Sequence, residues 1–353
     1  MSAQSEWKKQ FKLLQKFISA HPQIVLSKTE ISIPQQCRDE FYGKFDQIRR
    51  AFVEEHYPSL NVVIEQLHEN FVRVEKQVLE LLNVQEIAMP VDLHSFLHNP
   101  KEGLTRVLYN PLFDLLQGKT KPATFEAQSL DALQGASADL FRLGYEPWTA
   151  LVLIKLLEPD EAYFVDLDDD YKPFPTELKS ISFGRQAHHP TIRIPEFVLH
   201  SRRLDSYVGV KMALAQEADT FVVPFQPPVR PKKKTGDTSF ALDTRVLLLY
   251  LMPSREEIPI VAEIYDRKLT PPDLMVEYIT ENEYADPEAV GQVVQRLESL
   301  SPKLGTCLII VNSEKCPEPS VENIHTIAAG FDETRLQPII EKLAKPRQEI
   351  QES

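Results

Sequence analysis

The chain has 353 residues, of which 42% are hydrophobic and 26% charged, so we expect a packed core and two domains. Its net charge of −13 disfavours broad nucleic-acid binding, and no hydrophobic run approaches the roughly 20 residues that cross a bilayer. With no signal-peptide pattern and three cysteines that form no Cys-x-x-Cys pair, the sequence predicts a soluble cytoplasmic protein without membrane association, disulfide framework or structural zinc site.

Glycine is scarce and widely spaced. The chain has 11 glycines, and the closest two, Gly135 and Gly144, lie nine residues apart. The glycine-rich motifs of Rossmann and P-loop nucleotide sites and the Gly-x-Ser-x-Gly motif of α/β-hydrolases need closer spacing, because a Cβ would clash where the backbone turns sharply or meets a phosphate. These three motifs are therefore excluded.

Residues 1–158 are predicted to form a helical bundle. Hydrophobic residues recur at helical spacing within 7–18 and 41–52, and helices are also expected at 102–117, 126–143 and 147–157. The longest heptad seam consists of Leu60, Ile64, Leu67, Phe71, Val74, Val78 and Leu81. With Ser59 as a predicted N-cap, the short break before it predicts that 60–82 packs antiparallel against the preceding helix. The seam is either the core of the bundle or a surface for self-association.

Residues 159–345 are predicted to form an α/β or α+β sheet domain, followed by a tail at 346–353. The expected strands are 163–167 and 178–183, paired around an acidic turn, then 192–199, 221–225, 246–252, 258–265 and 307–311. Helical faces are expected at 204–217, 287–300 and 336–343.

The acidic turn places four carboxylates, Asp166, Asp168, Asp170 and Glu177, at positions 1, 3, 5 and 12 of a calcium-loop template. These are oxygen ligands suited to Ca²⁺ or Mg²⁺. The template then fails, because Tyr171 occupies the position that requires glycine. The alternative interpretation is a solvated hairpin tip whose charges discourage pairing between sheet edges.

The same region supports a second metal hypothesis. Pro159-Asp160 followed by Glu177-Leu178-Lys179 resembles the proline-aspartate and Glu-x-Lys pattern of the restriction-endonuclease-like nucleases. The resemblance implies a divalent-metal-dependent phosphodiesterase in which Glu177 and either Asp160 or Asp168 bind the metal and Lys179 stabilises charge at the phosphate. The pattern departs from the family in that Glu177 falls on the second predicted strand where the third is usual.

Two histidine pairs and one basic loop complete the candidate residues. His94 and His98 are four residues apart, and His188 adjoins His189, but neither pair has the three or four converging ligands of a metal site. The proline-rich segment 226–239 is predicted to be a solvated loop. Its basic residues could contact phosphates or an acidic partner: Arg230, Lys232, Lys233 and Lys234.

Taken together, the missing catalytic motifs, the heptad seam and the basic loop favour an interaction or assembly protein without its own catalytic centre. Its partner would be another protein or a second copy bound through 60–82, with nucleic acid contacted at most locally through 230–234. The alternative is the metal-dependent hydrolase that uses residues 160–179.

Overall fold

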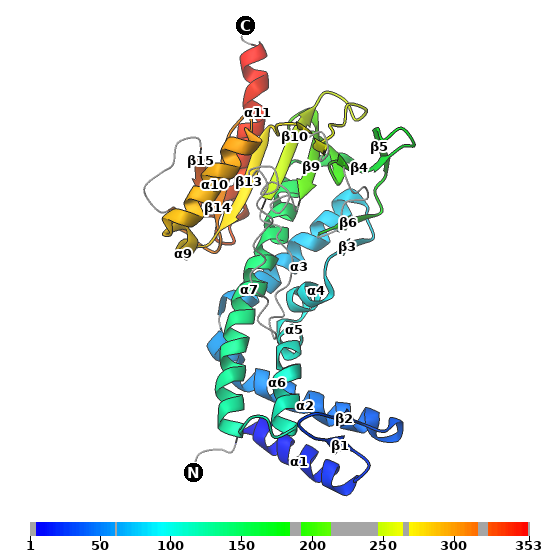
Figure 1. Cartoon of the computed structure of the whole chain (residues 1–353). Coiled ribbons are helices and arrows are strands. Elements are labelled where there is room, and N and C mark those ends of the chain that lie inside the picture. The colour runs from blue at the N-terminus through cyan, green and yellow to red at the C-terminus, as the bar shows by residue number, and fades with distance from the viewer. Residues whose placement is uncertain are drawn as a thin grey trace. The chain divides into compact units, whose positions relative to one another are not determined.

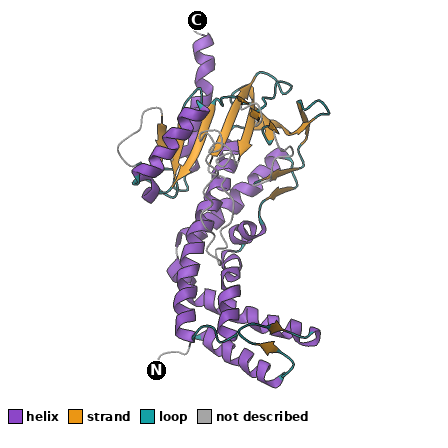
Figure 2. Cartoon of the chain, in the orientation of Figure 1, coloured by secondary structure: helices purple, strands orange, loops and turns teal. Residues whose placement is uncertain are grey.

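The computed structural model describes residues 5–60, 62–183, 192–212, 246–263, 268–316 and 324–351, and the chain divides into two compact units. The first contains Met1–Val72 and Val91–Gly144, and the second contains Arg73–Pro90 and Tyr145–Ser353. The class is α+β, a helical N-terminal region followed by a large mixed sheet with flanking helices (Figures 1 and 2). This division differs from the predicted boundary at residue 158 because α3 (Val62–Leu82) and α7 (Pro122–Leu156) contribute to both units.

The first unit is helical apart from one short hairpin. Besides parts of α3 and α7 it contains α1 (Glu6–Ala20), β1 (Val25–Leu26), β2 (Ile31–Ser32), α2 (Gln35–Leu60), α4 (Val91–His98), α5 (Pro100–Thr105), the 3-10 helix η1 (Arg106–Leu108) and α6 (Tyr109–Leu116). Aromatic rings fill its core, with the ring centroids of Trp7 and Phe125 5.2 Å apart and those of Phe45 and Phe113 4.6 Å apart. These buried faces are the hydrophobic stripes that the helical spacing predicts.

The predicted N-cap at Ser59 is wrong, whereas the antiparallel packing of 60–82 on the preceding helix stays a prediction. In the described part of the chain α2 packs on α1 and α5, and it continues through Pro58, so the hydroxyl of Ser59 donates to the carbonyl of His56 instead of capping α3. Within the first unit α3 meets α4, where the Nδ1 of His68 lies 2.6 Å from the carbonyl oxygen of Leu97. The heptad seam itself is buried within the chain, from Leu60 to Val78, and only Leu81 is exposed.

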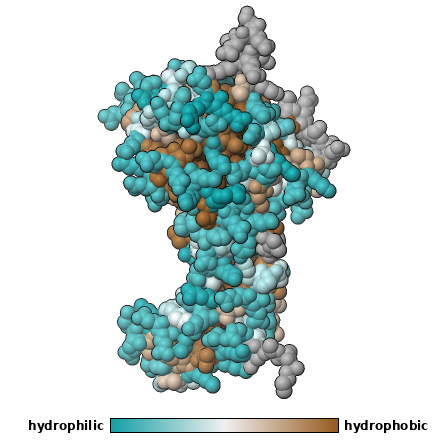
Figure 3. All heavy atoms as spheres, turned by 180° about the vertical axis from the view of Figure 1, so that it is seen from behind, coloured by the Kyte–Doolittle hydropathy of each residue, from teal (hydrophilic) through white to brown (hydrophobic). Residues whose placement is uncertain are grey.

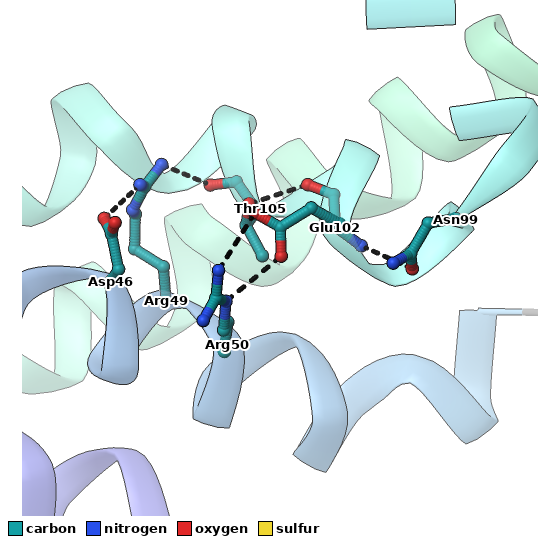
Figure 4. Close-up of polar contacts among 6 residues, drawn as sticks. All are labelled: Asp46, Arg49, Arg50, Asn99, Glu102 and Thr105. Atoms are coloured by element: carbon teal, nitrogen blue, oxygen red, sulfur yellow. Dashed lines mark hydrogen bonds and ion pairs between the residues drawn. The ribbon is translucent and has the colours of Figure 1, made fainter. Parts of the chain in front are cut away.

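A polar network joins α2 to α5 in the first unit. Figure 4 draws its members: Asp46, Arg49, Arg50, Asn99, Glu102 and Thr105. The half-buried Arg49 lies over the rings of Phe45 and Tyr109 and donates to the carbonyl of Thr105 at 3.2 Å, so it satisfies a carbonyl at the end of α5. Arg50 and Glu102 add an exposed ion pair at 3.0 Å. These contacts fix the crossing of two helices, which is a structural role.

The second unit is built on an eight-stranded mixed sheet with the order β15-β14-β13-β10-β9-β8-β4-β5. Its strands are β4 (Pro159–Leu167), β5 (Pro173–Glu177), β8 (Phe197–Ser201), β9 (Ser206–Met212), β10 (Val246–Met252), β13 (Leu274–Ile279), β14 (Thr306–Ile310) and β15 (Ile324–Ile327). Strands β13, β14 and β15 run parallel to one another, and every other neighbouring pair of strands in this sheet is antiparallel. Smaller sheets pair β12 (Lys268–Leu269) and β7 (Ile192–Arg193) with β11 (Ala262–Glu263), and β3 (Glu86–Ala88) with β6 (Ser180–Ser182).

Helices cover both faces of the large sheet. On one face α10 (Pro287–Leu300) buries Val293 against Leu308 and Leu300 against Met275, and Arg296 of α10 forms a buried ion pair with Glu277. The opposite face is covered by the end of α7 and by α11 (Gln337–Gln351) (Figure 1). The unit also contains α9 (Glu281–Tyr284) and the 3-10 helix η2 (Glu333–Leu336). The face under α10 also carries the candidate site.

Several predicted elements need correction. Residues 204–217 were predicted to be helical, but 206–212 form strand β9 between two neighbours. The partner of β4 around the acidic turn is β5, and 180–182 pair with β3 instead. The helices predicted at 126–143 and 147–157 are one helix that passes through Pro147, and α11 extends into the predicted tail. The strand predicted at 221–225 lies outside the described residues.

The surface is largely hydrophilic. Figure 3 shows hydrophilic residues over most of the rear view and hydrophobic residues gathered mainly on the unit that carries the large sheet. Among the described residues, no helix has the length and hydrophobicity to span a bilayer.

Candidate functional site

The candidate site lies on the sheet face that α10 covers, at the β4 end of that face. Side chains at directly paired positions share a face, so the strand register places a row of them together. Tyr207 on β9 lies between Met252 of β10 and His200 of β8. His200 in turn pairs with Glu161 of β4. Along this row the side chains thus change from hydrophobic in the middle of the sheet to polar on β4, next to the edge strand β5.

An irregularity in β4 brings a second carboxylate to this row. The register with β8 shifts between Pro159 and Glu161, which leaves Asp160 as an extra residue, and such bulges re-aim side chains. The Nδ1–H of His200 donates to Asp160 Oδ1 at 2.6 Å. This hydrogen bond lowers the pKa of Asp160, so its carboxylate is ionised at neutral pH. The side chain of His200 is 24% exposed and that of Asp160 is 41% exposed.

Glu161 is held by two tyrosines. The hydroxyls of Tyr163 and Tyr207 both donate to Glu161 Oε2, at 2.8 and 3.1 Å. Burial and these hydrogen bonds raise the pKa of both tyrosines, so the hydroxyls remain protonated donors at neutral pH. The Nη1 of Arg255 donates to the Tyr163 hydroxyl at 2.6 Å, and its guanidinium lies 5.0 Å from the centre of that ring.

These six residues are called the polar–aromatic face: Asp160, Glu161, Tyr163, His200, Tyr207 and Arg255. The ring of His200 packs 4.8 Å from that of Tyr207, so the members form one continuous set of contacts. Beside them on the same face of the sheet lies a hydrophobic cluster that includes Val165, Val198 and Met252. The face therefore combines a rigid support with side chains that solvent can reach.

The turns around the face are fixed by local structure. Ser201 is buried at the end of β8, where its hydroxyl donates to the carbonyl of Leu157 and accepts from the backbone N–H of Leu204. That pair of bonds ties the β8–β9 turn to the end of α7. Glu158, with a φ of 50°, ends the helix in the left-handed region and lets Pro159 begin β4. Asp160 and His200 meet because β4 begins and β8 ends at this junction.

The chemistry available to the face is limited. His200 and Asp160 resemble the base and orienting groups of an acid–base pair, but the neighbouring Ser201 is buried and already hydrogen-bonded, so it is not placed as a nucleophile. The face instead offers two carboxylates, aromatic rings and one guanidinium in fixed positions, which suits binding.

The acidic turn does not gather the four predicted metal ligands. The carboxylate of Asp168 accepts the backbone N–H groups of Asp170 and Lys172, at 2.9 and 2.8 Å, and so closes its own turn. Asp166 accepts from the adjacent N–H of Leu167. Within the described ranges, no group of three or more His, Cys, Asp or Glu side chains is arranged to hold a metal ion.

The residues of the nuclease-like pattern do not converge on one point either. Glu177 pairs with Lys179 at 3.7 Å, and both side chains are strongly exposed. Glu177 lies opposite Tyr163 on β4, and hence on the side of the polar–aromatic face, but Asp160 is three residues farther along, about 10 Å at the usual rise of a strand. Asp160 is engaged by His200 and not by Glu177 or Lys179.

The remaining candidates contribute no described site. His94 and His98 stack with their ring centroids 4.1 Å apart, an arrangement in which the two rings cannot both point at one ion. His188, His189 and the basic residues Arg230, Lys232, Lys233 and Lys234 lie outside the described residues.

Nothing in the sequence alone singles out His200, Tyr207 or Arg255, which lie 40 to 95 residues from Asp160 and reach it only through strand pairing. No protein-family model, curated protein or solved structure matches the chain. A functional conclusion therefore depends on the geometry of the polar–aromatic face.

Proposed function

We propose that this protein is an interaction protein without its own catalytic centre, and that it binds a protein partner through the polar–aromatic face. The observation that carries the proposal is the hydrogen-bonded set of Tyr163, Tyr207, His200 and Arg255, whose side chains are held in place while partly exposed. Tyrosine and arginine are enriched at binding hot spots, and side chains that are already ordered lose little entropy on binding.

The heptad seam is a poorer binding surface. Phe71, Val74 and Val78 are fully buried within the chain, so a second copy would have to displace the chain's own core to reach them. This burial favours the interpretation of the seam as core, and it moves the proposed interaction from 60–82 to the polar–aromatic face.

The metal-dependent hydrolase receives no comparable support. Its proposed ligands are occupied by separate partners, His200 for Asp160, backbone N–H groups for Asp168 and Lys179 for Glu177. Metal-assisted phosphoryl chemistry needs ligands that converge on one ion.

Photo-cross-linking in the native cell tests the proposal. A photoreactive phenylalanine analogue replaces Tyr207 in the full chain, and the same analogue at the exposed Leu13 of α1 serves as the matched control. We expect a discrete adduct from position 207 that is lost when Arg255→Ala is added and is absent from position 13. An adduct of twice the chain mass would identify a second copy as the partner. No adduct at 207, or one that is equal at position 13, would refute the proposal.

A further inference from the structure

Strand β4 and the turn that follows it are strongly acidic, and Lys172 at the end of the turn is their one basic residue. Residues 158–170 contain seven carboxylates and no lysine or arginine: Glu158, Asp160, Glu161, Asp166, Asp168, Asp169 and Asp170. The whole chain is also acidic, with a net charge of −13. A ligand that approaches this strand therefore meets a negative potential, which attracts cations and repels phosphates and other carboxylates.

Glu161 is oriented without being neutralised. Both of its hydrogen-bond partners among the described residues are tyrosine hydroxyls, and both donate to Oε2, so neither brings a positive charge to this carboxylate. The nearest guanidinium, that of Arg255, is bonded to the Tyr163 hydroxyl and to Glu256 at 3.0 Å. Within the described residues Glu161 Oε1 has no recorded hydrogen bond. A fixed, charged carboxylate with an open oxygen is suited to bind a cation.

Aromatic rings flank this carboxylate. Tyr207 and His200 pack together on one side of it, and both remain partly exposed. An ammonium or guanidinium group is attracted by an aromatic ring as well as by a carboxylate. Besides Arg255, the exposed Arg202 and Arg203 in the β8–β9 turn add positive charge near the face, so binding should be confined to the side of the face formed by β4.

From these contacts we infer that the polar–aromatic face binds a cationic protein segment, with a lysine or arginine side chain of the partner on Glu161 beside the packed rings of Tyr207 and His200. The inference rests on the proposed function and specifies the chemistry of the partner. Charge complementarity selects a basic segment over an acidic one. Tyr163 and Tyr207 are half-buried and the other four residues of the face are polar or charged, which disfavours a hydrophobic partner.

A defined peptide tests the inference. The probe is a fluorescein-labelled peptide with six lysines separated by glycine and serine, and the comparison peptide has glutamates in place of the lysines. Fluorescence anisotropy with the full chain should show binding of the lysine peptide only, and the binding should weaken as salt is raised from 50 to 200 mM. Equal binding of the two peptides would overturn the inference.

Matched variants locate the binding. Glu161→Gln removes the charge but keeps the acceptor for both tyrosines, and Glu80→Gln removes the same charge from a side chain that is 69% exposed on α3. We expect Glu161→Gln to weaken binding about two- to fivefold, in line with an exposed ion pair, while Glu80→Gln leaves it within error. Equal losses in the two variants would reduce the effect to net charge and overturn the inference. Thermal melts confirm that both variants fold.

The cross-linking experiment separates this inference from the proposed function. An Arg255-dependent adduct at position 207, together with peptide binding that ignores Glu161→Gln, would refute the cationic partner but leave the interaction function in place. If neither the adduct nor peptide binding appears, both fail.

Discussion

The buried pair formed by Glu196 and Lys211 gives the strongest prediction about stability. Glu196 precedes β8 and faces Lys211 of β9, with the Nζ of Lys211 2.6 Å from Glu196 Oε1. Glu196 Oε2 accepts the backbone N–H of Met212, also at 2.6 Å. The side chains are only 16% and 6% exposed, and burial raises the pKa of Glu196. Removing one partner therefore leaves a charge that water cannot reach.

The magnitudes follow from what each variant leaves unpaired. Glu196→Leu leaves a buried ammonium and an unpaired N–H at Met212, so the free energy of unfolding of the second unit should fall by about 3–5 kcal/mol. Combining it with Lys211→Met removes the stranded charge and leaves only the N–H, which costs about 1–3 kcal/mol. The double variant should therefore be more stable than Glu196→Leu alone.

Trp148 supplies the assay, because it is buried in the second unit and the only other tryptophan, Trp7, lies in the first. In a Trp7→Phe background, urea denaturation followed by fluorescence reports the second unit alone. As a control, Glu177→Gln in the exposed pair with Lys179 should change the free energy of unfolding by less than about 0.5 kcal/mol. The reasoning is refuted if the double variant is no more stable than Glu196→Leu, or if Glu196→Leu itself costs less than about 1 kcal/mol.

Three further predictions concern packing, protonation and metals. Gly103→Ala should destabilise the first unit in a thermal melt because the new Cβ would lie 2.6 Å from the Cα of Phe96, whereas Gly43→Ala, with nothing within 4 Å, should stabilise it by about 0.5–1 kcal/mol. The hydrogen bond from His200 lowers the pKa of Asp160, so it stabilises the folded state at pH values above the ordinary aspartate pKa of 3.8. This stabilisation is lost as the pH falls through the lowered pKa of Asp160. In the His200→Ala variant, the pKa of Asp160 measured by NMR titration should return toward 3.8. Melts in Ca²⁺, Mg²⁺ or Mn²⁺ should match those in EDTA within about 1 °C, and an ion-specific rise would revive the metal-dependent hydrolase.

Hydrophobic periodicity predicted correctly those elements that are buried along a single stripe or along their whole length. Residues 287–300 have one hydrophobic stripe and form α10, and 246–252 are a continuous hydrophobic run that forms a central strand. Residues 204–217 were wrongly predicted to be helical because Tyr207, Val208, Lys211 and Met212 fit helical spacing. Residues 206–212 instead form strand β9, which is covered on both faces. A lysine in such a strand is explained only by Glu196, which the sequence does not pair with it.

The candidate site depended on information that periodicity does not contain. Asp160 was singled out as a metal ligand, but its partner in the structure is His200, 40 residues away, and their contact requires both the register of β4 with β8 and the irregularity after Pro159. The carboxylates of the acidic turn are close in sequence, yet their oxygens bind neighbouring backbone N–H groups. Their proximity along the chain therefore predicted that the carboxylates converge on one ion, whereas the geometry of the turn directs them to backbone N–H groups.

The edge of the sheet constrains how a partner can bind near this site. β5 is the edge strand beside β4, and the N–H of Asp168 donates to the carbonyl of Lys172, so alternate residues from 172 onward bond toward β4. Pro173 and Pro175 occupy the intervening positions, whose N–H groups would point outward, and proline has none to offer. A partner therefore finds too few donors on this edge to add a strand. In the proposed interaction, a partner would therefore contact the side chains of the polar–aromatic face and would not extend the sheet.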